Sequence, residues 1–246
     1  MEARKMETTN VAVVGLGEIG KPLLELIREK YNGVGIDIDT KTSEKSFDIM
    51  HICYPYQIKN FVSVTTEYIA KYNPAITVIN STVAPGTTRK VHELTRKTIV
   101  HSPIRGKHIK MKNDLLFYTK FIGGINEQAS LTIRNHFESI GMKTKIFDSP
   151  ESTELAKLTE TTYFGMLIAW AQEIERYCDR LGLKYDEIVT FFDEIQYLPS
   201  VKFFPGVIGG HCVMQNIQLL KSIFNSDILD SVEKSNNMKK MRETSA

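Results

Sequence analysis

The sequence predicts an α/β protein with a doubly wound, mostly parallel sheet, followed by an α-helical domain built on one long helix. Short apolar runs alternate with helical patterns over the first 150 residues, an order typical of a parallel sheet. A glycine-rich turn joins the first such run to the first helical pattern, and one helical pattern then covers residues 152–181. We therefore expect one domain at residues 1–150 and a second at residues 151–246.

The first strand–turn–helix unit carries a G-x-G-x-x-G motif. The apolar run 11–14 is followed by Gly15, Gly17 and Gly20, with Glu18 and Ile19 between the last two glycines. This spacing allows a tight turn, close approach of a pyrophosphate to the backbone, and close packing of helix on strand. The start of the helix adds N–H groups and a positive dipole end. The unit predicts a Rossmann-type dinucleotide site formed by these five residues.

A second strand, predicted at residues 33–38, contains Asp37. An acid about 20 residues after the glycine loop is placed to bind the adenosine ribose. A carboxylate there would repel a 2′-phosphate, so we expect NAD rather than NADP. The combination of strand, loop, helix, strand and acid favours this site over a glycine-rich turn that binds no nucleotide.

The remaining elements continue the alternation. We expect residues 1–10 to be a disordered leader and residues 40–45 to hold little or no helix. Strands are predicted at 47–53, 75–80, 98–101, 117–123 and 143–147, with helices at 61–71, 126–140, 186–195, 216–224 and 228–238. A further helix is expected after the segment 81–88 and through residue 94. His51, inside an apolar strand, is expected to be a hydrogen-bonded core residue.

Candidate ligand-binding residues follow the third and fourth of these strands. Tyr54 and Pro55 end one, and the hydroxyl-rich segment 81–88, which includes Thr82, follows the other. Ligands of open α/β sheets bind at the carboxyl ends of the strands. We therefore add these three residues to the predicted cofactor site.

The long helix at residues 152–181 has apolar residues spaced by three and four, which predicts one buried stripe. Gly182 suits the end of the helix. The stripe indicates either a core face or a subunit interface. It contains Tyr163, Leu167, Trp170, Ile174, Cys178 and Leu181.

Composition excludes several other classes of protein. A net charge of +2, from 31 basic and 29 acidic residues, gives no general footprint for nucleic acid. The longest apolar runs fall short of the roughly 20 residues that span a bilayer, and the N-terminus lacks the apolar stretch of a signal peptide. Three cysteines without C-x-x-C pairing favour a reduced, cytoplasmic protein. No metal site is predicted.

With these motifs in place, the chain resembles the UDP-glucose/GDP-mannose dehydrogenase family, and its G-H-C loop resembles the UDP-N-acetylmannosamine dehydrogenase branch. The resemblance extends from about residue 11 to about residue 220. Six motifs in the family's order carry it: GLGEIG with Asp37, CYP at 53–55, STVAPGTT at 81–88, SPIRG at 102–106, ELAKL at 154–158 and PGVIGGHC at 205–212.

The resemblance implies NAD-dependent oxidation of a sugar alcohol. In the family, a cysteine at the position of Cys212 captures the aldehyde as a thiohemiacetal. Lys157 matches the lysine that stabilises the oxyanion, and Thr82 matches a threonine that positions a catalytic water. Glu154 matches an acid that precedes this lysine. The resemblance also implies a homodimer formed through residues 152–181.

The sequence departs from the family at four site positions. Thr161 replaces an active-site asparagine four residues after the lysine, and Asn216 replaces an acid expected to activate water. Ile104 replaces the glutamate of an S-P-E motif, and Met214 replaces a proline. The motifs of the family's further C-terminal domain, which binds the substrate nucleotide, have no counterpart here. We therefore expect a two-electron rather than a four-electron oxidation.

Two other functions fit parts of the sequence. A β-hydroxyacid dehydrogenase-like enzyme would use Lys157 as acid/base on a small hydroxy acid, with Cys212 incidental. A non-catalytic NAD-binding subunit would explain the altered site positions. Lys157 could also pair with Glu154 or Glu160, and His211 could be a bystander beside Cys212.

Overall fold

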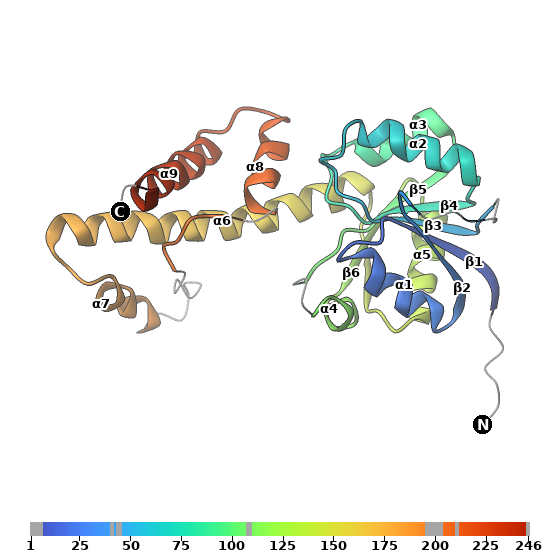
Figure 1. The fold of residues 1–246 in the computed structure, drawn as a ribbon, viewed down its shortest axis with the longest axis horizontal. Coiled ribbons are helices and arrows are strands. Elements are labelled where there is room, and N and C mark those ends of the chain that lie inside the picture. The colour runs from blue at the N-terminus through green and yellow to red at the C-terminus, as the bar shows by residue number, and fades with distance from the viewer. Residues whose placement is uncertain are drawn as a thin grey trace, which may run out of the picture. The chain divides into compact units, whose positions relative to one another are not determined.

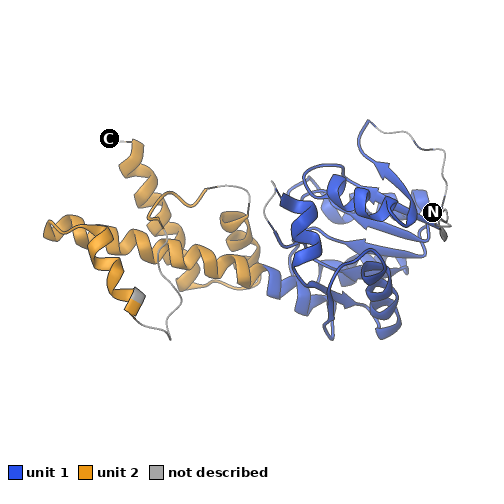
Figure 2. Ribbon diagram, turned by 90° about the horizontal axis from the view of Figure 1, so that it is seen from below, with its two compact units in different colours: residues 1–157 blue, residues 158–246 orange. Residues whose placement is uncertain are grey.

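The computed structural model describes residues 7–39, 42, 46–106, 110–194, 204–209 and 212–244. It divides into two compact units, residues 1–157 and 158–246 (Figure 2).

Unit 1 is built on a seven-stranded sheet of order β2-β1-β3-β4-β5-β6-β7 (Figure 1). Neighbouring strands are parallel except β5 and β6, which are antiparallel. The strands are β1 Glu7–Val14, β2 Tyr31–Ile36, β3 Ile49–Ile52, β4 Ile76–Ile79, β5 Thr98–His101, β6 Lys120–Gly124 and β7 Thr144–Ile146. Short, largely apolar strands suit a sheet that is buried on both faces.

Helices cover both faces of this sheet, so the predicted doubly wound fold is confirmed. Apolar side chains of α1, α4 and α5 form one core with one sheet face, and those of α2 and α3 form another with the opposite face. The helices are α1 Gly20–Arg28, α2 Phe61–Tyr72, α3 Thr87–Thr95, α4 Met111–Phe117 and α5 Glu127–Ser139.

Unit 2 is helical. It contains most of α6 Pro150–Leu181, together with α7 Tyr185–Thr190, the 3₁₀ turn η2 Phe191–Glu194, α8 Val213–Lys221 and α9 Asp227–Thr244. Ala169 of α6 forms an apolar cluster with Val213 and Ile217 of α8 and with Leu229 of α9. Gly182, at φ +66°, ends α6 as expected.

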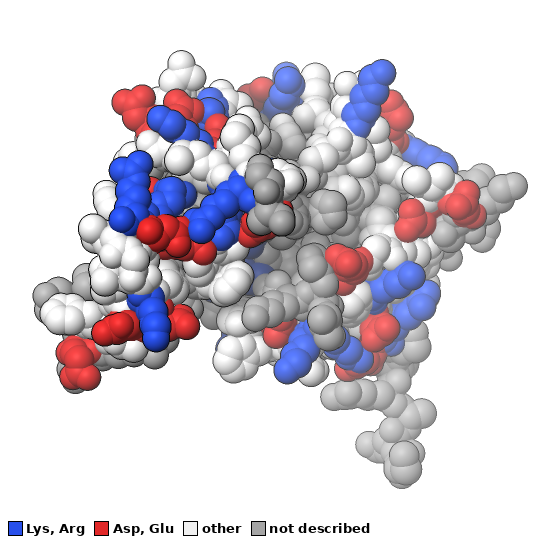
Figure 3. Space-filling model, turned by 60° about the vertical axis from the view of Figure 1, so that its left-hand side comes forward, with Lys and Arg blue, Asp and Glu red and all other residues white. Residues whose placement is uncertain are grey.

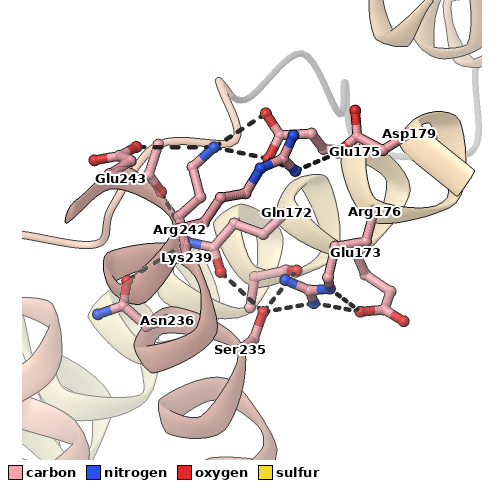
Figure 4. Close-up of polar contacts among 12 residues, drawn as sticks. Gln172, Glu173, Glu175, Arg176, Asp179, Ser235, Asn236, Lys239, Arg242 and Glu243 are labelled. Carbon is pink, nitrogen blue, oxygen red and sulfur yellow. Dashed lines mark hydrogen bonds and ion pairs between the residues drawn. The ribbon is translucent and has the colours of Figure 1, made fainter. Parts of the chain in front are cut away.

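Polar contacts also join α6 to α9 (Figure 4). Lys239 Nζ lies 2.7 Å from Glu175 Oε2, and Ser235 Oγ donates to Gln172 Oε1 over 2.9 Å. Asn236 Oδ1 accepts from the N–H of Ile208 over 2.7 Å. On the face drawn in Figure 3, basic and acidic side chains are interspersed. No helix in the described ranges is long and apolar enough to cross a membrane.

Several expected elements differ from the structure. The expected leader overlaps β1, which begins at Glu7 because its backbone pairs with β2. The strand expected from residue 117 begins at Lys120, because Phe117 ends the unpredicted helix α4. Residues 40–41 and 43–45 of the segment expected to lack helix lie outside the described residues.

The prediction that one apolar stripe of α6 is buried is wrong for a single chain. Tyr163 is 51% exposed, Trp170 49% and Leu181 69%, whereas Ile174 and Cys178 are buried. The helix turns a different face to α8 and α9, on which Ala169 and Gln172 are buried. Spacing by three and four identified an apolar face but not what covers it.

Candidate functional site

The glycine loop has the geometry of a phosphate-binding turn. Gly15 has φ +90°, and a Cβ there would lie 2.8 Å from the backbone N of Tyr54. A Cβ on Gly20 would lie 1.8 Å from the carbonyl oxygen of Gly15. Neither position therefore accepts a side chain.

Gly17 differs from these two glycines, because a Cβ there would meet no atom within 4 Å. Gly17 and Glu18 are exposed at the tip of the loop. Ile19 is the N-cap of α1 and provides no side-chain cap. Open space beside a glycine at a helix N-terminus fits a bound pyrophosphate, so the chain can hold a dinucleotide here.

Asp37 follows β2 and lies beside this loop. Its Oδ2 accepts the N–H of Leu16 over 2.8 Å, and its Oδ1 accepts the N–H of Ile38 over 2.8 Å. These bonds hold the carboxylate at the carboxyl edge of the sheet. The structure thus brings Asp37 to the glycine loop.

The segment after β3 joins the glycine loop to the loop after β4. The backbone of Tyr54 packs against Gly15, and the carbonyl oxygen of Tyr54 accepts a 2.5 Å hydrogen bond from Ser81 Oγ. The Tyr54 hydroxyl lies 2.7 Å from Thr65 Oγ1, and burial raises its pKa. Pro55 is exposed and Thr82 half-buried at this same edge.

Two buried side chains bind the loop after β4 to the first turns of α6. His101 Nε2 lies 3.1 Å from the carbonyl oxygen of Ser81, and its Nδ1 lies 2.7 Å from Thr153 Oγ1. Glu154, fully buried, accepts hydrogen bonds from Gly86 N and from Thr88 N and Oγ1. Burial lowers the pKa of His101 to about 3 and raises that of Glu154 to about 7.

Lys157 is half-buried one turn after Glu154 on α6, and Thr161 follows four residues later. Residues four apart lie on one helix face. The Glu154 carboxylate accepts hydrogen bonds from the start of α3 and the loop before it.

Cys212 lies in unit 2, where it is exposed and is the N-cap of α8. Exposure is what a nucleophilic thiol requires. Asn216 is buried on the first turn of α8, and its N–H donates to the carbonyl oxygen of Cys212. His211 lies outside the described residues. The roles of Cys212, Lys157, Thr82 and Thr161 stay predictions.

Sequence reasoning missed a buried lysine at the carboxyl edge. Lys120, 3% exposed at the start of β6, donates to Asn80 Oδ1 over 3.0 Å and to the carbonyl oxygens of Ser102 and Pro103. Burial lowers its pKa to about 7. Nearby, burial raises the pKa of the Cys53 thiol to about 12. A lysine opening an apolar strand was the available signal.

Known proteins resemble both parts of the chain. Residues 151–238 match the family profile described as UDP-glucose/GDP-mannose dehydrogenase family, central domain. This part of the chain is therefore similar to that central domain. The UDP-N-acetyl-D-mannosamine dehydrogenase of Methanococcus vannielii is 25% identical over 290 residues, which cover 97% of this chain and 64% of the relative. The enzyme of that name from Methanococcus maripaludis is 26% identical over 282 residues, which cover 94% of this chain and 63% of the relative. The chain thus spans slightly under two thirds of these relatives.

Solved structures support the fold. The UDP-D-ManNAc dehydrogenase from Pyrococcus horikoshii superposes with a TM-score of 0.81 at 21% identity, covering 93% of this chain and 68% of that chain. The 3-hydroxyisobutyrate dehydrogenase from Mycobacterium tuberculosis superposes with a TM-score of 0.74 at 13% identity. The match covers 97% of this chain and 94% of that chain. Both nucleotide-sugar and hydroxyacid dehydrogenases therefore share this architecture, and the profile match favours the UDP-glucose/GDP-mannose dehydrogenase family.

Proposed function

We propose that this chain is an NAD-dependent oxidoreductase that oxidises the alcohol or aldehyde carbon of a sugar-like substrate, most closely a nucleotide sugar. The observation that carries the proposal is the pairing of Asp37 with the open glycine loop at Gly17, in a chain that matches the family's central domain. The sequence relatives are named as dehydrogenases of UDP-N-acetyl-D-mannosamine, which supports the substrate class.

The residues of unit 1 would bind and orient the cofactor. Gly15 and Gly20 allow the tight turn, Gly17 leaves room for the pyrophosphate, and Asp37 accepts hydrogen bonds from the ribose. Its negative charge disfavours a 2′-phosphate, so NAD is preferred over NADP. Bound NAD supplies the hydride acceptor. Tyr54, Pro55 and Thr82 line the same edge of the sheet, where the substrate carbon would have to lie.

Cys212, Lys157 and Thr82 would provide the substrate chemistry. The Cys212 sulfur would add to an aldehyde carbon while the thiol proton passes to the carbonyl oxygen, which forms a thiohemiacetal. Lys157 would stabilise the developing oxyanion. Thr82 and Thr161 add hydroxyl groups. Asn216 cannot accept a proton at neutral pH, so hydrolysis of a thioester lacks its base and a two-electron oxidation is expected.

A homodimer formed through residues 152–181 is the second part of the proposal. Tyr163 and Trp170 are about half exposed on α6. They line an open groove of about 1070 Å³ between α6 and α9, together with Tyr177 and Met238. Large apolar side chains left exposed on one face favour a protein contact. A second copy of the chain would cover this face.

Turnover tests the proposed function. The protein is incubated with NAD and a panel of UDP-sugars, and the absorbance of the reduced cofactor is followed. We expect NAD reduction with at least one sugar nucleotide. Capture of the resulting aldehyde should be lost in Cys212→Ser but not in Cys178→Ala, because Cys178 is buried away from solvent in unit 2. Turnover of a small hydroxy acid that survives Cys212→Ala would instead indicate the β-hydroxyacid dehydrogenase activity. NAD binding without turnover would indicate a non-catalytic subunit.

A further inference from the structure

A separate cavity of about 360 Å³ lies at the amino-terminal edge of the sheet, where β1, β2 and β3 begin. The glycine loop is at the opposite, carboxyl edge, so this cavity is distinct from the proposed cofactor site. Its lining residues come from the starts of these strands and from one side of α5. They are Thr9, Lys30, Tyr31, Ile49, Thr132, Asn135, His136 and Ser139.

A buried chain of hydrogen bonds leads from the carboxyl edge to this cavity. Lys120 Nζ donates to Asn80 Oδ1 over 3.0 Å, so the Asn80 amide nitrogen faces the other way, donating to the Val78 carbonyl oxygen and lying 3.2 Å from His51 Nδ1. His51 Nε2 lies 3.0 Å from His136 Nε2. His51 is completely buried, and His136 is 4% exposed.

This series of hydrogen bonds determines which ring nitrogen of each histidine carries the proton. Burial lowers the pKa of both histidines, that of His136 to about 4, so each ring is neutral near pH 7 and carries one N–H. Asn80 donates to His51 Nδ1, which leaves the proton of His51 on Nε2. His51 therefore donates to His136 Nε2, and the proton of His136 lies on Nδ1.

His136 Nδ1 is thus a buried donor, and it has no hydrogen-bond partner within the described chain. Buried N–H groups are nearly always paired, so an unpaired one calls for an acceptor. Two hydroxyls that line the cavity do not accept from it. Ser139 Oγ donates to the carbonyl oxygen of His136 over 2.7 Å and lies 2.5 Å from the Tyr31 hydroxyl.

The charge of the cavity indicates what kind of acceptor fits. Lys30 is among its lining residues, and none of the eight is acidic. The Lys30 ammonium lies 5.9 Å from the centre of the Tyr31 ring and close enough to His136 to help lower its pKa. A cation together with neutral donors favours an anionic oxygen ligand.

We propose that this cavity binds a small oxyanion, a phosphate or carboxylate group, held by the Lys30 ammonium and the Nδ1–H of His136. Nδ1 has almost no accessible surface, so the imidazole must tilt toward the cavity to reach the ligand. The new charge-assisted hydrogen bond offsets the cost of that tilt. The site is independent of the proposed dehydrogenase activity.

Imidazole NMR of the ¹⁵N-labelled full chain tests the proposal. We expect His136 in the Nδ1–H form, and its N–H signal to move and saturate as inorganic phosphate or citrate replaces chloride at constant ionic strength. Saturation by phosphate alone assigns a phosphate ligand, and saturation by citrate alone assigns a carboxylate. An Nε2–H form of His136, or no saturable shift with either anion, would overturn the proposal.

A pair of lysine variants tests the contribution of charge. Lys71 is a matched control, because its ammonium lies 4.9 Å from the ring centre of the following Tyr72, as Lys30 lies over Tyr31. Calorimetry should show affinity for the bound anion weakened about tenfold or more in Lys30→Gln and unchanged in Lys71→Gln. Equal losses in both variants would contradict a specific site.

Discussion

Glu154 of α6 accepts two hydrogen bonds from Thr88 of α3, one from its backbone N over 2.9 Å and one from its hydroxyl over 2.6 Å. A third comes from Gly86 N over 2.7 Å. Glu154 thus caps α3 from another helix, since α3 has no side-chain cap of its own from Gly86. The contact holds the loop that contains Thr82 against the turn of α6 that contains Lys157.

Glu154→Gln should destabilise the protein by about 1–3 kcal/mol, because an amide NH₂ replaces an oxygen that faces an N–H donor. Urea unfolding at pH 8 measures the loss. Glu151→Gln is the matched control: Glu151 pairs with Arg89 at the surface, and such a pair contributes under about 1 kcal/mol. Equal losses in the two variants would contradict the capping role.

Alanine at two glycines should separate folding from nucleotide binding. Gly17→Ala should fold normally, since its Cβ meets no protein atom, yet bind NAD about tenfold or more weakly because the methyl group would fill the pyrophosphate position. Gly20→Ala should lower the melting temperature, because its Cβ would collide with Gly15. Full NAD affinity in Gly17→Ala would place the pyrophosphate elsewhere.

His101 should make the protein sensitive to acid. Its folded pKa of about 3 lies below its ordinary value of 6.5, so below pH 6.5 the unfolded chain binds a proton that the folded chain does not. Its contribution to stability is therefore complete above pH 6.5 and is lost as the pH falls toward 3. His101→Gln should show a shallower decline in the free energy of unfolding over that range. An unchanged slope would contradict a neutral, buried His101.

Lys120 should make the stability of the protein depend on pH in the alkaline range. Its folded pKa is about 7 and its ordinary value 10.5, so between these values the unfolded chain binds the extra proton and stability rises with pH. Lys120→Met should remove this rise, which urea midpoints at pH 7 and pH 10 would reveal. If stability rises by the same amount in the variant, the rise comes from groups other than Lys120.

The fold and the cofactor half of the site could largely be predicted from sequence, because they depend on local patterns. The glycines at 15, 17 and 20 require a particular backbone, and Asp37 is placed by the length of one strand–helix–strand unit. Apolar runs identified every strand of unit 1 to within a few residues.

Contacts between distant residues could not be predicted. Lys120, Asn80 and Ser102 meet only because β6 runs antiparallel beside β5, and no local pattern specifies that pairing. The exposure of Trp170 depends on which face of α6 meets α8 and α9. Spacing within one helix carries no information on that choice.

Calorimetric titration with NAD and NADP tests the central claim most directly. We expect NAD to bind more tightly than NADP and Asp37→Ala to weaken NAD binding about tenfold or more. Asp148→Ala, an exposed acid beyond β7, should leave it unchanged. Unchanged NAD affinity in Asp37→Ala, or no NAD binding by the unmodified protein, would contradict the assignment of a dinucleotide site.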